Sequence, residues 1–173
     1  MKGQLTLEFM ASFIIFIIFI IYIYSQFSSN VPLFIEEIGK ENKRSKAFQI
    51  SELILNDAGE PANWNNPSSA KRIGLSYEGV NKTNLLSYDK IASLNTYCQS
   101  NYYSLKKKIG VEENFTIQFN SISSDGSRVN LLRCFPPTLQ LESGQVNATV
   151  RRITSYYDSV DGQIKLGELI IQV

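Results

Sequence analysis

The residue types that carry most enzyme chemistry are scarce in this chain of 173 residues, which has no histidine and two cysteines. Without histidine, a Ser-His-Asp triad, a Cys-His pair and a histidine-ligated zinc site are all excluded. Two cysteines are too few for a Cys₄ zinc site. The acidic pairs Glu36-Glu37 and Glu112-Glu113 have no histidine or cysteine at catalytic spacing. The sequence therefore predicts no catalytic residues, no metal site and no cofactor.

Glu8 is the residue whose position most clearly suggests a chemical role. It is the last charged residue before positions 9–35, which carry no charge. A carboxylate costs about 2.5–3.5 kcal/mol at the centre of a bilayer and less near the interface. Glu8 therefore either lies among lipid headgroups with no further role, or is neutralised by a partner charge in a bundle of helices.

The element that must position Glu8 is a long apolar segment. Leu5 to Tyr24 as a helix would be about 30 Å long, which matches the hydrocarbon core of a bilayer. Strands usually run about 4 to 8 residues, so this length favours a helix. A helix that is apolar on every face must be surrounded by lipid or by other helices. The sequence therefore predicts a membrane as one partner.

Three interpretations of this segment compete. A secretory signal peptide fits poorly, because the apolar run is long and the SQFSSN that follows offers no small-x-small cleavage site. A plain anchor with its N-terminus inside gains no support from the positive-inside rule. Only Lys2 precedes the span, whereas four basic residues follow it: Lys40, Lys43, Arg44 and Lys46. In the third interpretation a short leader is cut off, and the apolar helix stays on the mature protein.

The first nine residues, MKGQLTLEF, favour the third interpretation. They resemble the class III signal peptide of archaeal type IV pilin-like proteins, whose cores read KGQxSxEF or close variants. The matching residues are Lys2, Gly3, Gln4, Glu8 and Phe9, with Thr6 in place of the commoner serine. The resemblance implies that a prepilin peptidase cuts between Gly3 and Gln4. Glu8 would then be the fifth residue of the mature chain, the position that carries glutamate across pilins.

Such a cut would create an ammonium group at Gln4, one helical turn from Glu8 and on a similar face. In a packed bundle, Glu8 of one subunit can pair with the Gln4 amine of a neighbour. That pairing would neutralise both charges and set the axial offset between subunits. We therefore predict that Gln4 and Glu8 direct subunit assembly, with a Glu8 that merely lies in the headgroup region as the alternative.

Beyond the apolar run, the pattern predicts a second helical stretch. Pro32 lacks a backbone donor, so we expect a kink or break near it. Leu33 to Asp57 then alternates apolar and charged residues at a roughly helical period. The turn residues after Asp57 end this helix. Trp64 follows in the polar loop of residues 59–72, and we expect it to pack back onto the domain.

The rest of the chain predicts one more helix and a set of strands. Asn84 to Gly110 has a helical pattern, with Lys106 to Lys108 in its last turn and Gly110 at its C-cap. From Glu113 onward the period is two. The expected turns are residues 124–127, Ser143-Gly144 and Asp161-Gly162, and the expected strands are Glu113 onward, Arg128 to Phe135, around Leu139, Val146 to Tyr156 and Gln163 to Val173. We expect an antiparallel meander of four or five strands whose apolar face is covered by the amphipathic helix. Leu169, Ile171 and Val173 fall on one face of the last strand.

These elements predict an α+β fold in which a long N-terminal helix, apolar in its first half and amphipathic in its second, packs on a C-terminal antiparallel sheet. Pilins have this shape, and the head also resembles archaeal pilin-like proteins in GEPxNW after the long helix, IGL at residues 73–75 and YSLKKKIG at residues 103–110. The expected organisation is a leader of residues 1–3, a transmembrane or filament-core helix of residues 4–31, and an extracytoplasmic head of residues 32–173.

Two covalent features are expected in the head. An even cysteine count outside the cytoplasm favours a disulfide between Cys98 and Cys134, with two buried free thiols as the alternative. Asn81, Asn114 and Asn147 each begin an N-x-Thr sequon, which is about as many as chance would give. Glycosylation at these positions is implied by the resemblance, because pilin-like proteins are often glycosylated.

The resemblance implies a subunit, major or minor, of an archaeal type IV pilus-like surface filament. Its partners would be the membrane, a prepilin peptidase, other pilin subunits and the pilus assembly machinery. The net charge of +1 gives no field that would attract nucleic acid, so we expect no nucleic-acid partner. We expect a single-pass protein of the cell membrane with its head outside, which moves into a filament on assembly. The alternative is a membrane-anchored surface binding protein that never polymerises.

Overall fold

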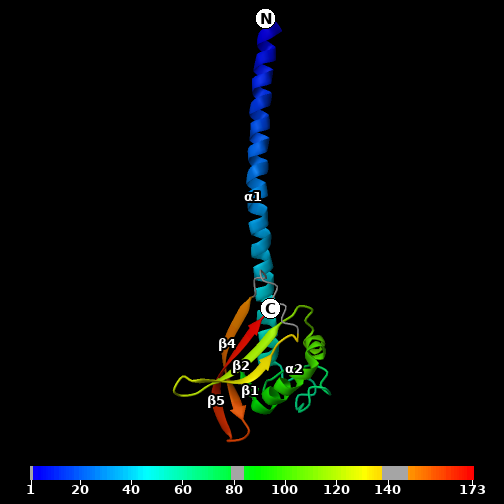
Figure 1. Cartoon of the computed structure of the whole chain (residues 1–173), viewed down its shortest axis with the longest axis vertical. Helices are drawn as coiled ribbons and strands as arrows, with labels where there is room; N and C mark the ends of the chain where they lie inside the picture. Colours follow the sequence, from blue (N-terminus) through cyan, green and yellow to red (C-terminus); the bar gives the residue numbers. More distant parts are fainter. Residues whose placement is uncertain (1, 79–83, 138–147) are drawn as a thin grey trace. The chain divides into compact units, whose positions relative to one another are not determined.

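The computed structural model describes residues 2–78, 84–137 and 148–173 (Figure 1). Side chains are described from Glu8 onward. These residues form α1 (Lys2–Asn56), β1 (Leu85–Ser87), α2 (Tyr88–Ile109), β2 (Thr116–Ile122), β3 (Arg128–Cys134), β4 (Thr149–Asp158) and β5 (Gln163–Gln172). The chain divides into two compact units, residues 1–41 and residues 42–173. In the first unit the described residues all belong to α1. The second, which we call the head, contains the last turns of α1 and all the other elements.

The first helix does not end at Pro32. α1 includes Pro32 in its interior and stops at Asn56, one residue before the predicted end. Of the kink or break expected near Pro32, the break is absent. Proline removes one helical hydrogen bond, to the carbonyl four residues earlier, at a cost of about 3 kcal/mol. Helix propagation adds a bond for every further residue, so the long flanks on both sides keep the helix intact around that one missing bond.

Among the described residues, the sheet has five strands in the order β1-β4-β5-β2-β3. β2 and β3 form one antiparallel hairpin and β4 and β5 form another, while β2 also pairs antiparallel with β5. β1 pairs with β4 in parallel. Four of the predicted strands are present as β2 to β5, whereas β1 was not predicted. The simple meander is wrong, because β5 pairs with β2 as well as with β4. The predicted strand around Leu139 and the turn at Ser143-Gly144 lie outside the described residues.

The helix predicted at Asn84 to Gly110 begins later than expected. Residues 85–87 form the short parallel strand β1, and α2 starts only at Tyr88. The mistake arose because a short apolar run such as Leu85-Leu86 fits a buried strand as well as a helix. The other end agrees with the prediction. Gly110 has a φ of 77°, in the left-handed region that favours glycine, and its N–H donates to the Lys106 carbonyl at 3.1 Å.

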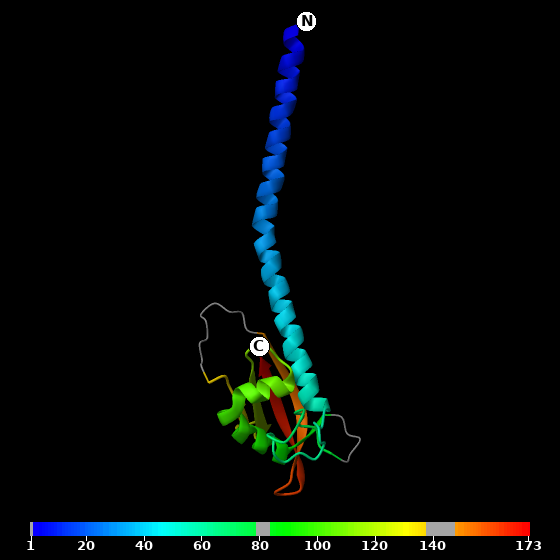
Figure 2. The ribbon, with the colours of Figure 1, turned by 90° about the vertical axis from the view of Figure 1, so that its right-hand side faces the viewer.

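One face of the sheet is covered by α2 and by the last turns of α1, residues 42–56 (Figure 2). Ile54 of α1 and Leu94 of α2 belong to the same buried cluster as Phe119 of β2. Leu169, Ile171 and Val173 lie on this covered face, as predicted. The ion pairs Glu52–Arg152 and Lys46–Glu113 fasten the last turns of α1 to β4 and to the segment before β2.

The predicted α+β class is confirmed, and the helix on a mostly antiparallel sheet is consistent with a pilin-like fold.

Candidate functional site

The most prominent feature of the first unit is an apolar surface on α1. Exposed apolar side chains run from Phe9 to Tyr24 and, after the mostly polar residues 25–30, recur from Leu33 to Ile38. At a rise of 1.5 Å per residue, this stretch is about 44 Å long, whereas the hydrocarbon core of a bilayer is about 30 Å thick. A helix would need a tilt of more than about 40° to hide this length, and membrane helices are tilted by about 20° on average. The apolar surface is therefore longer than one bilayer covers.

α1 is the one helix among the described residues that is long and apolar enough to cross a membrane. Gly3 and Gln4 lie in its helical backbone, but their side chains fall outside the described part of the chain. The Glu8 side chain is exposed. Gln4 and Glu8 are thus one helical turn apart on a single element, as the assembly hypothesis requires. Cleavage at Gly3 and pairing of Glu8 between subunits stay predictions.

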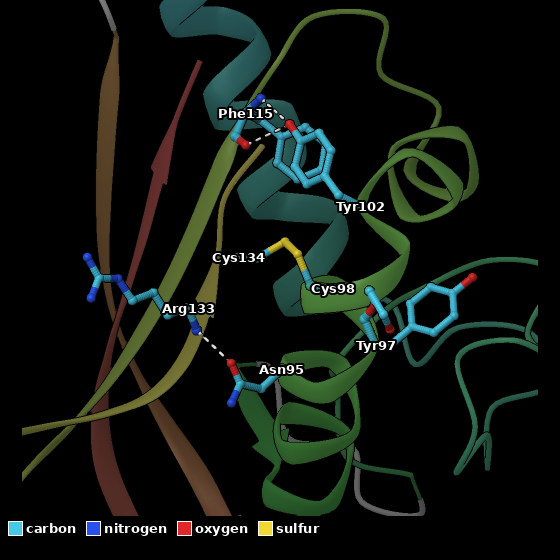
Figure 3. Close-up of a disulfide and its surroundings, with 8 residues drawn as sticks. Asn95, Tyr97, Cys98, Tyr102, Phe115, Arg133 and Cys134 are labelled. Carbon is cyan, nitrogen blue, oxygen red and sulfur yellow. Dashed lines mark hydrogen bonds between the residues drawn. A yellow bond between two sulfur atoms is a disulfide. The ribbon is translucent and has the colours of Figure 1, made fainter. Parts of the chain in front are cut away.

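The disulfide predicted between Cys98 and Cys134 is present, so the alternative of two free thiols is wrong (Figure 3). The Cα atoms lie 5.6 Å apart, and both side chains are buried. The bond joins α2 to β3, which is an edge strand of the sheet. Close by, the Arg133 N–H donates to the Asn95 side chain at 3.0 Å, which makes a second link between the same two elements.

Tyr102 provides another link from α2, this time to the start of β2. Its hydroxyl donates to the Phe115 carbonyl and accepts from the Phe115 N–H, both at 2.9 Å (Figure 3). One buried side chain thus satisfies both backbone groups of Phe115. Burial raises the pKa of the Tyr102 hydroxyl above its usual value. The disulfide and these hydrogen bonds hold α2 firmly on the covered face of the sheet.

The loop after α1 is held by two lysines whose roles the sequence did not reveal. Lys90, near the start of α2, donates to the carbonyls of Ala58, Ala62 and Ser76 at 2.6–2.9 Å. Lys108, near the end of α2, donates to three carbonyls at 2.6–2.8 Å: those of Pro67, Ser68 and Ala70. Lys108 lies in the last turn, as predicted, but it also anchors the loop. The sequence pattern could not indicate this because the acceptors are backbone carbonyls 14 to 41 residues away.

Trp64 packs back onto the head, as predicted from its place in a polar loop. It is 2% exposed, and its indole N–H donates to the carbonyls of Ala58 and Gly74 at 3.1 and 3.0 Å. Gly59 and Gly74 approach it closely. A Cβ at Gly59 would lie 2.5 Å from the Trp64 nitrogen, and Gly59 has a φ of +88°. The GEPxNW segment is therefore a packing motif around the tryptophan, and its indole is not free to meet a ligand.

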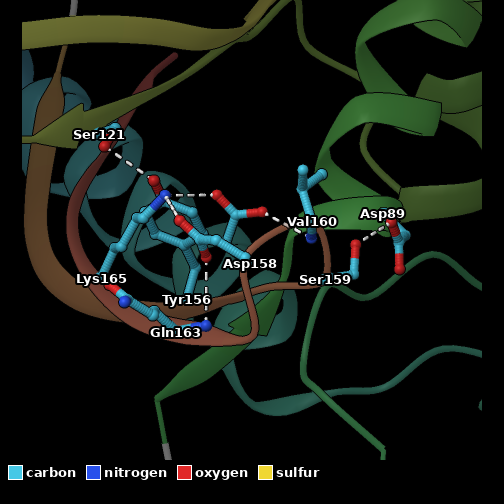
Figure 4. A network of polar contacts seen from close by, with 9 residues as sticks. Asp89, Ser121, Tyr156, Asp158, Ser159, Val160, Gln163 and Lys165 are labelled. Carbon is cyan, nitrogen blue, oxygen red and sulfur yellow. Dashed lines mark hydrogen bonds and ion pairs between the residues drawn. The ribbon is translucent and has the colours of Figure 1, made fainter.

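An acidic cluster occupies the turn between β4 and β5 (Figure 4). Lys165 pairs with Asp158 at 2.7 Å and with Asp161 at 2.5 Å. The Asp158 carboxylate also accepts from the Val160 N–H at 3.0 Å, and the Ser159 hydroxyl bonds Asp89 at the start of α2. The two carboxylates raise the pKa of Lys165, which in turn lowers that of Asp161. This cluster stabilises the turn predicted at Asp161-Gly162.

No group of three His, Cys, Asp or Glu side chains in the described chain is arranged to hold a metal ion. A groove of about 340 Å³ lies between α1 and the segment after α2, with Ile50, Leu53, Ile109 and Val111 among its apolar lining residues. The charged residues at the groove include Lys46 and Glu113, which are paired with each other. Apart from this ion pair, the polar side chains that line the groove are those of Gln49 and Glu112.

The predicted glycosylation sites are only partly described. Asn114 is exposed, and its side-chain oxygen accepts from the Lys106 ammonium at 3.3 Å. Asn81 and Asn147 lie outside the described residues. Glycosylation of all three stays a prediction.

The comparisons with known proteins add no relative. The chain matches no protein-family model, no curated protein and no solved structure.

Proposed function

We propose that this chain is a subunit, major or minor, of an archaeal type IV pilus-like surface filament. A prepilin peptidase cuts it between Gly3 and Gln4, and the apolar part of α1 then serves first as a membrane anchor and later as the filament core. The MKGQLTLEF start, the apolar helix directly after it and a head with a helix on a mostly antiparallel sheet support this proposal.

The observation that carries the proposal is the length of the apolar surface on α1. A plain anchor needs about 20 apolar residues. Here exposed apolar residues recur beyond that length, after the mostly polar residues 25–30, at Leu33, Phe34, Ile35 and Ile38. Outside the hydrocarbon core these side chains gain stability only where another apolar surface covers them. Neighbouring subunits in a filament supply such a cover along the whole length, whereas a solitary anchor leaves this part of α1 in water.

Assembly on this proposal exchanges lipid contacts for contacts between helices. Glu8 of one subunit meets the new amino group of Gln4 in its neighbour, so that neither charge stays unpaired in the core. This pairing fixes the axial step between subunits. Other pilin subunits and an assembly machinery are the partners that the proposal requires.

The first experiment compares cells with and without this chain by electron microscopy of surface filaments, together with the intact mass of the exported protein. We expect filaments only when the chain is present, and a mature N-terminus at Gln4. Gly3→Val should leave the leader uncut and abolish the filaments. A mature N-terminus at Met1, or one beyond Tyr24, would refute the proposal.

The second experiment separates assembly from anchoring. Glu8→Ala should abolish filaments while the protein still inserts into the membrane at wild-type levels. Glu36→Ala is the matched control, because Glu36 is an exposed acid of the same helix that already pairs with Lys40. Normal filaments from Glu8→Ala would favour a surface protein that is anchored and does not polymerise.

A further inference from the structure

The sheet face that turns away from α2 carries a mixed apolar and basic patch. Side chains alternate between the two faces of a strand. Leu166, Glu168 and Ile170 of β5 therefore lie on this outer face, opposite to the face that carries buried Leu169 and Ile171. We call Arg128, Arg151, Ile153, Leu166 and Glu168 the outer-face patch. Ile153 is 62% exposed and lies directly opposite Glu168 in the register of β4 and β5. No described element covers Ile153 or Leu166, which is 46% exposed.

Glu168 organises the charges of this patch. Its side chain is buried, and two arginines reach it from opposite sides, Arg128 from β3 at 3.4 Å and Arg151 from β4 at 3.7 Å. No described residue donates a hydrogen bond to the Glu168 Oε2 atom. Each guanidinium has five N–H donors and is more than half exposed, so most of its donors remain available to an external carboxylate. The two arginines and the one buried acid leave the patch with a net positive charge.

A complementary surface occurs on α1 of the same chain. Phe34, Glu37, Ile38 and Glu41 are spaced by three and four residues, so they share one face of the helix. We call them the α1 acidic face. All four are exposed. Glu36 and Lys40 lie toward the opposite side and pair with each other at 2.7 Å, so their charges cancel. The α1 acidic face therefore presents two carboxylates beside two large apolar side chains.

We infer that the α1 acidic face of one subunit docks on the outer-face patch of the next subunit. Glu37 and Glu41 then meet the guanidiniums of Arg128 and Arg151, and the apolar side chains of Phe34 and Ile38 cover Ile153 and Leu166. The inference rests on the proposed function and adds to it the surface through which the heads are joined. Charge and polarity match on both sides: acids face arginines, and apolar groups face apolar groups.

The two surfaces are different parts of one chain, so the contact is head-to-tail. Contacts of this kind repeat from copy to copy and produce open helical filaments when the rotation does not close into a ring. A helical face of about two turns is small compared with the roughly 800 Å² per partner of a standard interface. The contact is therefore weak between free subunits and acts together with packing of the apolar helices in the filament.

A charge exchange in the full-length chain tests the inference, with surface filaments counted by electron microscopy. Glu37→Arg and Arg151→Glu should each reduce filament number at least tenfold. The two changes combined should restore it to within about twofold of the wild type, a rescue that a folding defect cannot produce. Lys107→Glu is the control, an exposed charge of α2 outside both surfaces, and should leave filaments unchanged. Wild-type filament number in both single variants, or a combined variant as defective as either single one, would overturn the inference.

Cysteine cross-linking gives a second measurement that does not depend on filament number. Ile38→Cys combined with Leu166→Cys should give a ladder of covalent multimers on oxidation of assembled filaments. Ile38→Cys combined with Lys107→Cys should give none. A ladder only in the second pair would refute this interface and leave the proposed function intact. Failure of the wild-type chain to form filaments would instead refute the proposed function itself.

Discussion

Lys90 and Trp64 donate hydrogen bonds to the same acceptor, the carbonyl oxygen of Ala58, at 2.8 and 3.1 Å. The Lys90 ammonium also lies 5.7 Å from the centre of the Trp64 ring, within the range of a cation–π contact. Lys90 comes from α2 and Trp64 from the loop after α1. The path of the chain from α1 to Ser76 is therefore set by two buried donors and the backbone carbonyls that accept from them.

Lys90→Met should destabilise the protein by about 3 kcal/mol, because it leaves buried carbonyls without a donor. Trp64 is the one tryptophan of the chain, so its fluorescence reports this region directly. We expect a lower denaturant midpoint for the full-length protein in detergent, together with a red-shifted emission. Lys107→Met, at an exposed position of the same helix, should change stability by less than about 0.5 kcal/mol. Equal midpoints for the two variants would show that Lys90 does not hold the loop.

The buried hydroxyl of Tyr102 should make the free energy of unfolding depend on pH in the alkaline range. Burial raises the pKa of its hydroxyl in the folded state above the usual value of 10.0. Above pH 10 the unfolded chain therefore loses the Tyr102 proton before the folded chain does. The stabilisation from this group is fully present below pH 10 and is lost as the pH rises through the raised folded pKa.

The check is the free energy of unfolding of the wild type and of Tyr102→Phe between pH 8 and pH 12. At pH 8 the variant should be less stable by about 1–3 kcal/mol, because both backbone groups of Phe115 lose their partner. This difference should shrink above pH 10. A difference that stays constant across the whole range would mean that ionisation of Tyr102 is not linked to folding.

The disulfide between Cys98 and Cys134 should stabilise the head. Cys98 and Cys134 are 36 residues apart, so their bond restricts a loop whose closure is worth about 3–4 kcal/mol in the chain-entropy model. Replacing both by alanine should destabilise the head by about this amount. Reductant should lower the thermal midpoint of the wild type and leave that of the double variant unchanged. If reductant lowered both midpoints equally, its effect would not come from this bond.

The predictions that succeeded concern features encoded by neighbouring residues. Gly110 ends α2 because glycine alone adopts a left-handed conformation at little cost, and Asp161-Gly162 forms a turn for a related reason. The alternation of Leu169, Ile171 and Val173 placed all three on the covered face. The disulfide followed from the number of cysteines and the expected location of the head, and the structure confirms it.

The predictions that failed concern competition between distant residues. β4 lies beside β5 and not beside β3, and β1 takes residues that could equally begin a helix. Both outcomes depend on which distant strand offers a segment its backbone hydrogen bonds and covers its apolar side chains. The local sequence pattern contains no information about that partner. Of the kink or break expected near Pro32, the break did not occur, because the cooperativity of a long helix outweighs the local cost of one missing hydrogen bond.

The sequence alone determined one long apolar helix and a small α+β head, because the period and length of the apolar residues leave few other ways to remove them from water. Only the tertiary structure decided which backbone carbonyls accept hydrogen bonds from Lys90 and Lys108 and which two arginines form ion pairs with Glu168. These contacts join residues that are far apart in the chain, and only the folded backbone brings a donor within about 3 Å of such an acceptor.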